Sequence, residues 1–382
     1  MPIHLKEVKN DRQLRDFIRF PLKLYENNPY YVPALFTDEY QTLHHQKNPS
    51  FEHCEARYWL ALIGDQVVGR IAGIINHKHI QKWDEHYIRF GWFDFVDDLE
   101  VSGALLSVVE NWAKERQLTA LHGPLGFTDL DREGMLIEGF EELGTLATLY
   151  NYPYYPDHMA FHGFMKDVDW IEYELQVPSS LDPRITRSTN IILMRNNLKL
   201  LKINNKRELL SYAPNIFELI NKEYSHLYGA VPLSDKEIQH YVNAYFSFIH
   251  PDFVPIIVDE RENLAAFGGA IPSLSKALQK SSGRLFPLGW LRLLRSLRKN
   301  HRADLYLVAV DKRYQGLGVN LVLMDRLCRV FNERGIKVVE SNPELETNID
   351  VQSQWKILDK RQHKRRRCFI KKIIYNYENI TI

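Results

Sequence analysis

The sequence is poor in the features that mark secreted, membrane-spanning or nucleic-acid-binding proteins. It has three cysteines, Cys54, Cys328 and Cys368, without the spacing of a metal site or a disulfide framework. No apolar run approaches the length of a membrane-spanning helix, and the N-terminus lacks the basic and apolar segments of a signal peptide. The formal net charge is +1, so no overall charge attracts nucleic acid. These absences predict a cytoplasmic protein with no metal and no nucleic-acid partner.

What the sequence does contain is enough apolar residues for two domains. Of its 382 residues, 45% are hydrophobic and 25% are charged, which are ordinary globular values. The order of strand and helix patterns found up to residue 177 is repeated from residue 198. The intervening residues 178–197 open with a Pro- and Ser-rich composition that is typical of a linker. We therefore predict an α/β fold with domains at residues 1–177 and 198–382, joined by a linker at 178–197.

The most informative stretch runs from Ala303 to Asn342. It predicts a buried strand, a turn containing Gly316 and Gly318, an amphipathic helix that ends at Gly335, and a second buried strand. A glycine turn that leads into a helix exposes unpaired backbone N–H groups and the positive end of the helix dipole. Phosphate is the anion that such a site usually binds. The alternative is an ordinary tight turn that needs glycine for its backbone angles.

This turn matches neither a Walker loop nor a dinucleotide-binding fingerprint. Residues 313–318 read Arg-Tyr-Gln-Gly-Leu-Gly after a hydrophobic strand. They resemble the Q/R-x-x-G-x-G/A pyrophosphate loop of the GNAT N-acyltransferases, and the order of the predicted elements resembles that family as well. The resemblance implies two tandem GNAT-like domains, each a mixed twisted sheet flanked by helices. It also implies that the loop amides bind the pyrophosphate of acetyl-CoA or acyl-CoA, while the preceding strand pairs with the pantetheine arm. The residues implied in cofactor binding are Val308, Ala309, Val310, Arg313, Tyr314, Gln315, Gly316, Leu317 and Gly318.

The first half lacks the glycines of this loop. When the halves are aligned at the ends of their corresponding helices, Asp98 falls on Gly316 and Glu100 on Gly318. Carboxylates at these positions would repel a phosphate strongly in a half-buried site. We therefore predict a degenerate GNAT-like domain followed by one that retains the acyl-CoA pyrophosphate loop.

Two other polar patterns in the first half are weaker. Residues 129–134 match the opening of an EF-hand loop, but the twelfth position is Phe140, so calcium is not expected. The surrounding stretch resembles a segment of tandem GNAT-like proteins of bacteria. His77 and His79 stand at the end of a predicted strand with no third ligand nearby, which favours a surface pair over a metal site.

The catalytic candidates follow the second strand of the informative stretch. In GNAT domains this strand and the cofactor strand separate, and the reacting centre lies in the gap. Glu340 and Asn342 stand there, and Glu340 can act as the base that takes a proton from an ammonium substrate. The alternative is a surface glutamate at a strand end. The tyrosine that often protonates the leaving thiolate in this family is not evident in the second domain; Tyr154 and Tyr155 occupy that region of the first.

Two basic segments of the sequence are candidates for contact with a partner or with the rest of the protein. Residues 290–298 form a basic amphipathic helix that can lie on a membrane surface, bind an anionic partner or pack on its own domain. We predict packing as a lid beside the cofactor cleft. The run Lys364–Arg367 is predicted as a charged edge strand.

The function expected from the resemblance is an acyl-CoA-dependent N-acyltransferase. It would transfer an acetyl or acyl group to a small-molecule or peptide amine by direct attack on the thioester, which requires orientation more than a nucleophilic residue. One alternative is a Fem-type aminoacyl transferase, which uses aminoacyl-tRNA and which neutral charge and the intact loop disfavour. Another is a non-catalytic acyl-CoA sensor or scaffold, which the absent tyrosine favours.

Overall fold

The computed structural model describes residues 2–180, 182–246 and 248–375, so the end of the predicted second domain, 376–382, lies outside the described residues. The chain divides into two compact units. Unit 1 comprises Met1–Gly144, Thr148–Trp170 and Lys364–Ile382, and unit 2 comprises Thr145–Ala147 and Ile171–His363. Within the described residues, no helix is long and apolar enough to cross a membrane.

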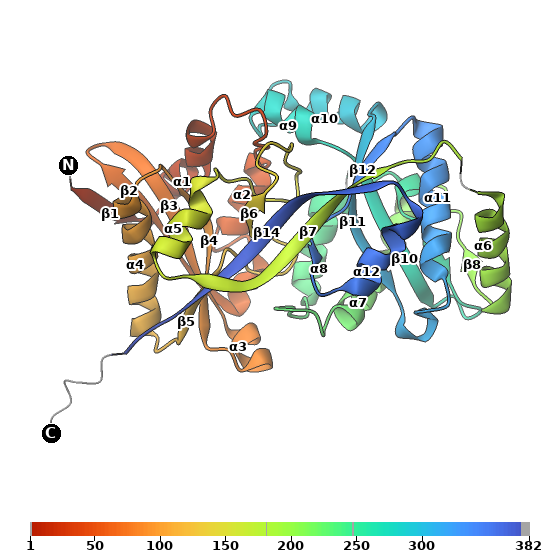
Figure 1. Cartoon of the computed structure of the whole chain (residues 1–382), viewed down its shortest axis with the longest axis horizontal. Coiled ribbons are helices and arrows are strands. Elements are labelled where there is room, and N and C mark those ends of the chain that lie inside the picture. Colours follow the sequence, from red (N-terminus) through yellow and green to blue (C-terminus); the bar gives the residue numbers. More distant parts are fainter. Residues whose placement is uncertain (1, 181, 247, 376–382) are drawn as a thin grey trace. The chain divides into compact units, whose positions relative to one another are not determined.

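The elements of the first half, with the last strand of the chain, appear in Figure 1. The strands are β1 (Ile3–Glu7), β2 (Cys54–Ile63), β3 (Gln66–Asn76), β4 (Tyr87–Phe95), β5 (Ala120–Gly123), β6 (Met135–Glu138), β7 (Met165–Gln176) and β14 (Lys360–Lys372). The helices are α1 (Asp11–Leu24), α2 (Phe36–Leu43), η1 (Pro49–Glu52), α3 (His77–Trp83), α4 (Leu99–Glu115) and α5 (Tyr154–Phe161).

The second half has a similar succession of elements. The strands are β8 (Lys199–Leu200), β9 (Ile256–Val258), β10 (Leu264–Pro272), β11 (Arg302–Val310), β12 (Val338–Glu340) and β13 (Glu344–Leu345). The helices are α6 (Pro183–Arg195), α7 (Lys206–Glu223), α8 (Asp235–Tyr241), η2 (Val242–Phe246), η3 (Pro251–Phe253), α9 (Ser275–Ser281), α10 (Gly289–Arg298), η4 (Lys312–Tyr314), α11 (Val319–Arg334), α12 (Ile349–Ser353) and η5 (Gln354–Ile357).

Each unit contains a run of six neighbouring strands with the same pattern of strand directions, and β6 and β13 pair beside these runs. The order is β1-β2-β3-β4-β5-β14 in unit 1 and β8-β9-β10-β11-β12-β7 in unit 2. The pairs β4–β5 and β11–β12 are parallel and only three residues long, whereas the other neighbours in each order are antiparallel. The predicted α/β class, with a mixed sheet in each half, is confirmed.

The strand that completes each sheet differs from the prediction. The domain bounds predicted from the sequence place residues 170–177 in the first domain, but Glu174–Gln176 of β7 pair with β12 in unit 2. The same bounds place residues 365–374 in the second domain, but Phe369–Lys372 of β14 pair with β5 in unit 1. Figure 1 shows the blue strand β14 reaching β5. Strand partners are non-local, so the pattern within one strand does not identify them.

The run Lys364–Arg367 is consequently not a charged edge strand, which corrects the prediction. This part of β14 also pairs with β6, and Lys364 and Arg366 are almost fully buried. Arg365 and Arg367 form ion pairs with Asp169, at 3.2 and 2.7 Å. These cations are therefore used inside unit 1.

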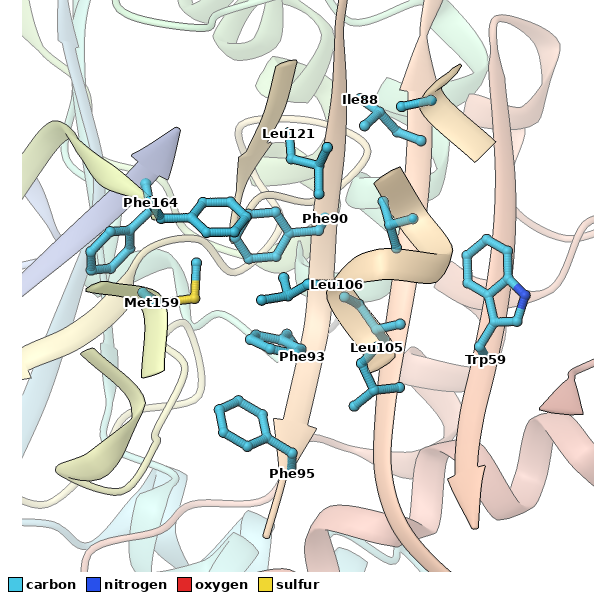
Figure 2. Packing of buried hydrophobic residues seen from close by; sticks show 14 of the residues in the cluster. Trp59, Ile88, Phe90, Phe93, Phe95, Leu105, Leu106, Leu121, Met159 and Phe164 are labelled. Atoms are coloured by element: carbon cyan, nitrogen blue, oxygen red, sulfur yellow. The ribbon is translucent and has the colours of Figure 1, made fainter. Parts of the chain in front are cut away.

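The unit 1 sheet is covered on both faces because its strands alternate two apolar sets. Trp59 and Ala61 of β2 pack in a core that includes residues of α4, shown in Figure 2, where Leu105 and Leu106 lie near Phe93. The next residues on the other face, Tyr58 and Leu60, pack with α1. This period of two is what a strand buried on both sides requires.

Helix α1 contains a proline and still has no interruption. It is continuous through Pro21, and it is capped by the Asn10 side chain. Pro21 is itself buried in the helix, so packing of the apolar face compensates for the backbone bond that proline cannot make.

One of the helices that pack on the unit 2 sheet is α11, whose apolar stripe was predicted from the sequence. Phe331 packs near Ala303 of β11, and Val319 packs near Val310. Helix α6, which lies within the segment predicted as a linker, packs Ile192 in the same cluster as Val319. This segment thus contains a helix, and residues 182–197 belong to unit 2.

Candidate functional site

The loop between β11 and α11 has the geometry of an anion site. Gly316 and Gly318 have φ angles of +74° and +82°, in the left-handed region that favours glycine. Gly318 is the N-cap residue of helix α11, and no side chain forms a capping hydrogen bond there. A Cβ added at Gly316 would meet no atom within 4 Å, so this side of the loop is open. Uncapped first-turn amides beside open space fit a pyrophosphate group.

The loop is held in place by the last residues of α7, which the sequence did not indicate. The Glu223 carboxylate accepts a hydrogen bond from the backbone N–H of Lys312 at 3.1 Å and another from the Gln315 side chain at 3.0 Å. The Gln315 amide also donates to the Val310 carbonyl at 2.9 Å. These bonds fix the start of the loop to the neighbouring helix.

Lys222 and Tyr224 complete this contact. The Lys222 ammonium lies 2.9 Å from Asp311, and the Tyr224 hydroxyl donates to the Val308 carbonyl at 2.9 Å. Burial disfavours the Asp311 carboxylate, but hydrogen bonds from Arg313 and Lys222 outweigh this and lower its pKa well below the usual range. Burial raises the pKa of Tyr224 to about 12, so its hydroxyl is protonated at neutral pH.

The predicted cofactor residues occupy different places around this loop. Arg313 lies 2.9 Å from Asp311 and 3.7 Å from Asp259, so its side chain is bound to carboxylates of the protein. Tyr314 packs against the cluster below the loop, and Leu317 is exposed. Val308–Val310 pair with β10. The backbone of the loop, not the arginine, is therefore the part suited to an anion.

The corresponding helix start in unit 1 is closed to an anion. Asp98 is the cap of α4, and its Oδ1 accepts the backbone N–H groups of Glu100 at 2.8 Å and Val101 at 3.3 Å. This carboxylate bonds the amides that a phosphate would use. The Tyr154 hydroxyl donates to the Phe95 carbonyl at 2.6 Å.

The predicted separation of the two parallel strands is present in unit 2. Strands β11 and β12 pair at only three positions, the last of which joins Asp304 to Glu340. Beyond this point the side chain of Asn342 donates to the Tyr306 carbonyl at 2.6 Å and so bridges the gap. Glu340 and Asn342 are therefore both at the point where the strands separate.

Glu340 is not a surface residue. It is 4% exposed, and one carboxylate oxygen lies 3.5 Å from Nε2 of His363 and the other 3.7 Å from the Arg302 guanidinium. Glu172, fully buried on β7, completes a group in which one atom each of Glu172, Glu340 and His363 lie within 4.8 Å of one another. The surface-glutamate alternative is thus wrong.

Sequence reasoning missed Glu172 and His363 because they come from distant strands. One signal was present: Glu172 and Glu174 alternate with apolar residues in β7, so both point to one sheet face. Glu174 stands directly beside Glu340 in the ladder and binds Arg302 at 2.8 Å.

The group of Glu172, Glu340 and His363 could also hold a divalent cation, since two carboxylates and an imidazole are a common donor set. The second such group among the described residues is His122, Asp167 and Cys368 in unit 1. Arg302 already supplies positive charge beside Glu340. The expectation that no metal is needed stays a prediction.

Glu344 is a further titratable group in this segment. Trp355 donates to its carboxyl at 2.7 Å. Burial raises the pKa of Glu344 to about 7, although the hydrogen bonds from Trp355 and Ser341 act in the opposite direction. This carboxyl therefore titrates near neutral pH.

The two weaker motifs have structural roles. In the former EF-hand match, Asp131 accepts the backbone N–H groups of Phe127 at 2.7 Å and Thr128 at 3.2 Å and so orders a turn. His77 and His79 lie on α3 and not at a strand end, which corrects the prediction. His77 is exposed, whereas His79 is buried and lies 3.1 Å from Glu85.

No protein-family model matches the chain. Protein YghO of Escherichia coli is 27% identical over 371 residues, which cover 95% of this chain and 94% of that protein. A Caulobacter vibrioides protein named bacterial ceramide synthase is 25% identical over 320 residues, 81% of this chain and 80% of that protein. A tandem GNAT protein from the clavulanic acid biosynthesis pathway superposes with a TM-score of 0.57 at 12% identity, covering 98% of this chain and all of that one.

Replacing Glu344 by Gln should remove a pH dependence of stability between about pH 4.5 and 7. Below pH 4.5 the Glu344 carboxyl is protonated in both the folded and the unfolded protein. Between pH 4.5 and 7 it ionises in the unfolded protein but stays protonated in the folded one, so the free energy of unfolding falls as the pH rises towards the pKa of the folded state. Across this pH range the free energy of unfolding of the wild type should fall by about 3 kcal/mol more than that of Glu344→Gln, because a shift of one pKa unit corresponds to about 1.4 kcal/mol. Denaturant unfolding of both proteins across this range measures the difference, and parallel curves would contradict the assignment.

Proposed function

Because the chain has the fold of the GNAT acyltransferases in the tandem arrangement, we propose that unit 2 is an acyl-CoA-dependent N-acyltransferase. The observation that carries the proposal is the open glycine loop at an uncapped helix N-terminus, at the end of β11, the strand that separates from β12 after Asp304. The first feature suits a pyrophosphate. The second leaves β11 without β12 as a strand partner beyond Asp304, and an extended pantetheine arm binds there like an added strand.

The residues of the loop hold the cofactor in this proposal. The first-turn amides of α11 and the loop glycines receive the pyrophosphate, while Val308–Val310 align the arm. Acyl-CoA supplies the activated thioester. The braces from Glu223 and Lys222 keep the loop in its binding conformation before the cofactor arrives, which lowers the entropic cost of binding.

Glu340 is the proposed base. A primary amine reaches the site as an ammonium, and its nitrogen can attack only after it loses a proton. The Glu340 carboxylate is buried at the separation of the strands, beside His363 and Arg302. It takes the proton directly or through one water. The amine nitrogen then forms the bond to the acyl carbon as the carbon–sulfur bond breaks, and it loses its second proton to solvent, which balances the proton given to the departing thiolate.

Tyr224 is the proposed donor of the proton to the departing thiolate, the role for which the sequence offered no tyrosine. It comes from the end of α7. Its hydroxyl lies 2.9 Å from the Val308 carbonyl, on the strand that the arm would follow. Its raised pKa keeps the proton in place until the thiolate forms.

The acceptor class is suggested by one relative. A ceramide is an amide of a long-chain amino alcohol, and the Caulobacter protein carries the name ceramide synthase. This supports a lipid-like amine as an acceptor to test here, beside small-molecule and peptide amines. The formation of such an amide from an acyl-CoA and an amine belongs to the reaction class proposed above.

Gly316→Val should weaken CoA binding by about tenfold or more, equivalent to about 1.4 kcal/mol. The left-handed angle strains any side chain, and the added atoms enter the open space where the pyrophosphate would bind. Isothermal calorimetry with CoA measures the effect. The matched control is Gly335→Val, which has the same backbone strain and open surroundings at the other end of α11. Equal affinities of the two variants would exclude this loop as the binding site.

Glu340→Gln should reduce kcat by about 100-fold while CoA affinity is kept, since a positioned base typically contributes 10²–10⁴-fold. Thiol release from acetyl-CoA and from a long-chain acyl-CoA, with a panel of amines that includes a long-chain amino alcohol, measures turnover. Glu174→Gln, which changes the neighbouring carboxylate in the same ladder, is the control and should have a smaller effect.

Two other results would favour the alternative functions. Tight CoA binding by the wild type without turnover on any amine would favour a sensor or scaffold. Retention on immobilised tRNA, but not on immobilised CoA, would favour a Fem-type aminoacyl transferase.

Tyr224→Phe should lower kcat by about tenfold or more with little change in CoA affinity, because it removes a proton donor and keeps the ring. If the hydroxyl only orders β11, CoA affinity should fall together with kcat. A thioester with a more acidic thiol needs less help from a proton donor and should partly restore the rate of the variant. No restoration would contradict the role of Tyr224.

A further inference from the structure

An exposed apolar surface lies on the insertion between β10 and β11. Trp290, Leu291 and Leu294 of α10 are between 41% and 47% exposed, and Phe286 and Leu288 in the preceding turn are 78% and 55% exposed. Elsewhere in the described residues, no stretch of nine residues contains five large apolar side chains that are exposed. Monomeric proteins rarely leave such a group in water without a use.

Helix α10 is fixed to its own unit by its other side. Leu293 is buried, and the Ser296 hydroxyl and the Asn300 side chain both donate to the Ser273 carbonyl, at 2.9 and 2.6 Å. Arg292 donates to the Lys280 carbonyl of α9. The predicted packing is therefore found on this side only. The outer side remains uncovered, so the helix is an anchored ridge and not a lid that buries its apolar residues.

The segment that carries this ridge is rich in exposed cations. No Asp or Glu occurs between Glu262 and Asp304. The exposed basic residues are Lys276, Lys280, Arg284, Arg292, Arg295, Arg298 and Lys299. Within the described part of the chain, no ion pair joins any of these seven to a carboxylate. The net charge of the whole protein hides this local concentration.

We propose that the surface formed by Phe286, Leu288, Trp290, Leu291 and Leu294, with its basic rim, docks on an anionic lipid bilayer. The apolar side chains enter the boundary between headgroups and acyl chains, where tryptophan is favoured. The arginines and lysines contact the lipid phosphates. A nucleic acid would satisfy the cations but leave the apolar residues in water, and an apolar protein groove would leave the cations without partners. The combination favours a charged lipid surface.

The test uses the full-length protein and sedimentation with vesicles. Binding is expected to vesicles of phosphatidylcholine with about one third phosphatidylglycerol, to weaken in pure phosphatidylcholine, and to weaken as salt increases. Two double variants separate the contributions: Leu291→Asp with Leu294→Asp, and Arg295→Glu with Arg298→Glu. Each should reduce binding about tenfold or more. Circular dichroism establishes that both remain folded.

The matched control changes exposed apolar residues elsewhere in unit 2. Ile191 and Met194 on α6 are 50% and 78% exposed, and Ile191→Asp with Met194→Asp should bind vesicles as the wild type does. The proposal is overturned if the wild type fails to bind anionic vesicles, or if the control loses as much as the α10 variants. Binding to RNA without binding to vesicles, or a dimer that the Leu291 and Leu294 variant dissociates, would also overturn it. Acyl transfer in solution is measured separately, so this result does not depend on the proposed activity.

Discussion

The geometry of the candidate site depends on one contact, in which the end of α7 holds the loop that follows β11. Three consecutive residues, Lys222 to Tyr224, bind Asp311, the start of the loop and the Val308 carbonyl. The acids involved are neutralised within this contact, because Asp311 receives Lys222 and Arg313. These carboxylates are therefore paired within the protein, while the loop presents its backbone N–H groups outward. A phosphate site requires both conditions at once.

The two units show how little separates a helix start that can bind an anion from one that cannot. Their sheets have the same order of directions and the same short parallel pair. In unit 1 the carboxylate of Asp98 caps α4, and in unit 2 Gly318 begins α11 without a side-chain cap. A side-chain cap stabilises the helix by bonding its free amides. Helix α11 lacks this stabilisation, and its amides remain available to a ligand.

Local features of this chain could be predicted from the sequence, and non-local ones could not. Strand β11, the glycine loop and the end of α11 at Gly335 follow from periodicity and glycine positions within about thirty residues. The partners of β7 and β14 depend on residues far along the chain, and their assignment was wrong. The position of Glu340 at the end of β12 was predicted. Its burial was not, because the residues that surround it, Glu172 and His363, belong to β7 and β14, whose partners could not be predicted.

The charges around Glu340 explain why this carboxylate, among its neighbours, suits a chemical role. Arg302 lies 2.8 Å from Glu174 but 3.7 Å from Glu340, so its shorter contact is to Glu174. Glu340 has the longer contact and shares its surroundings with His363 and the fully buried Glu172. Burying carboxylates together costs stability that a well-packed apolar pair would not. A fold retains such an arrangement most readily where a charge is used, and Glu340 stands where two strands separate and leave room for a substrate.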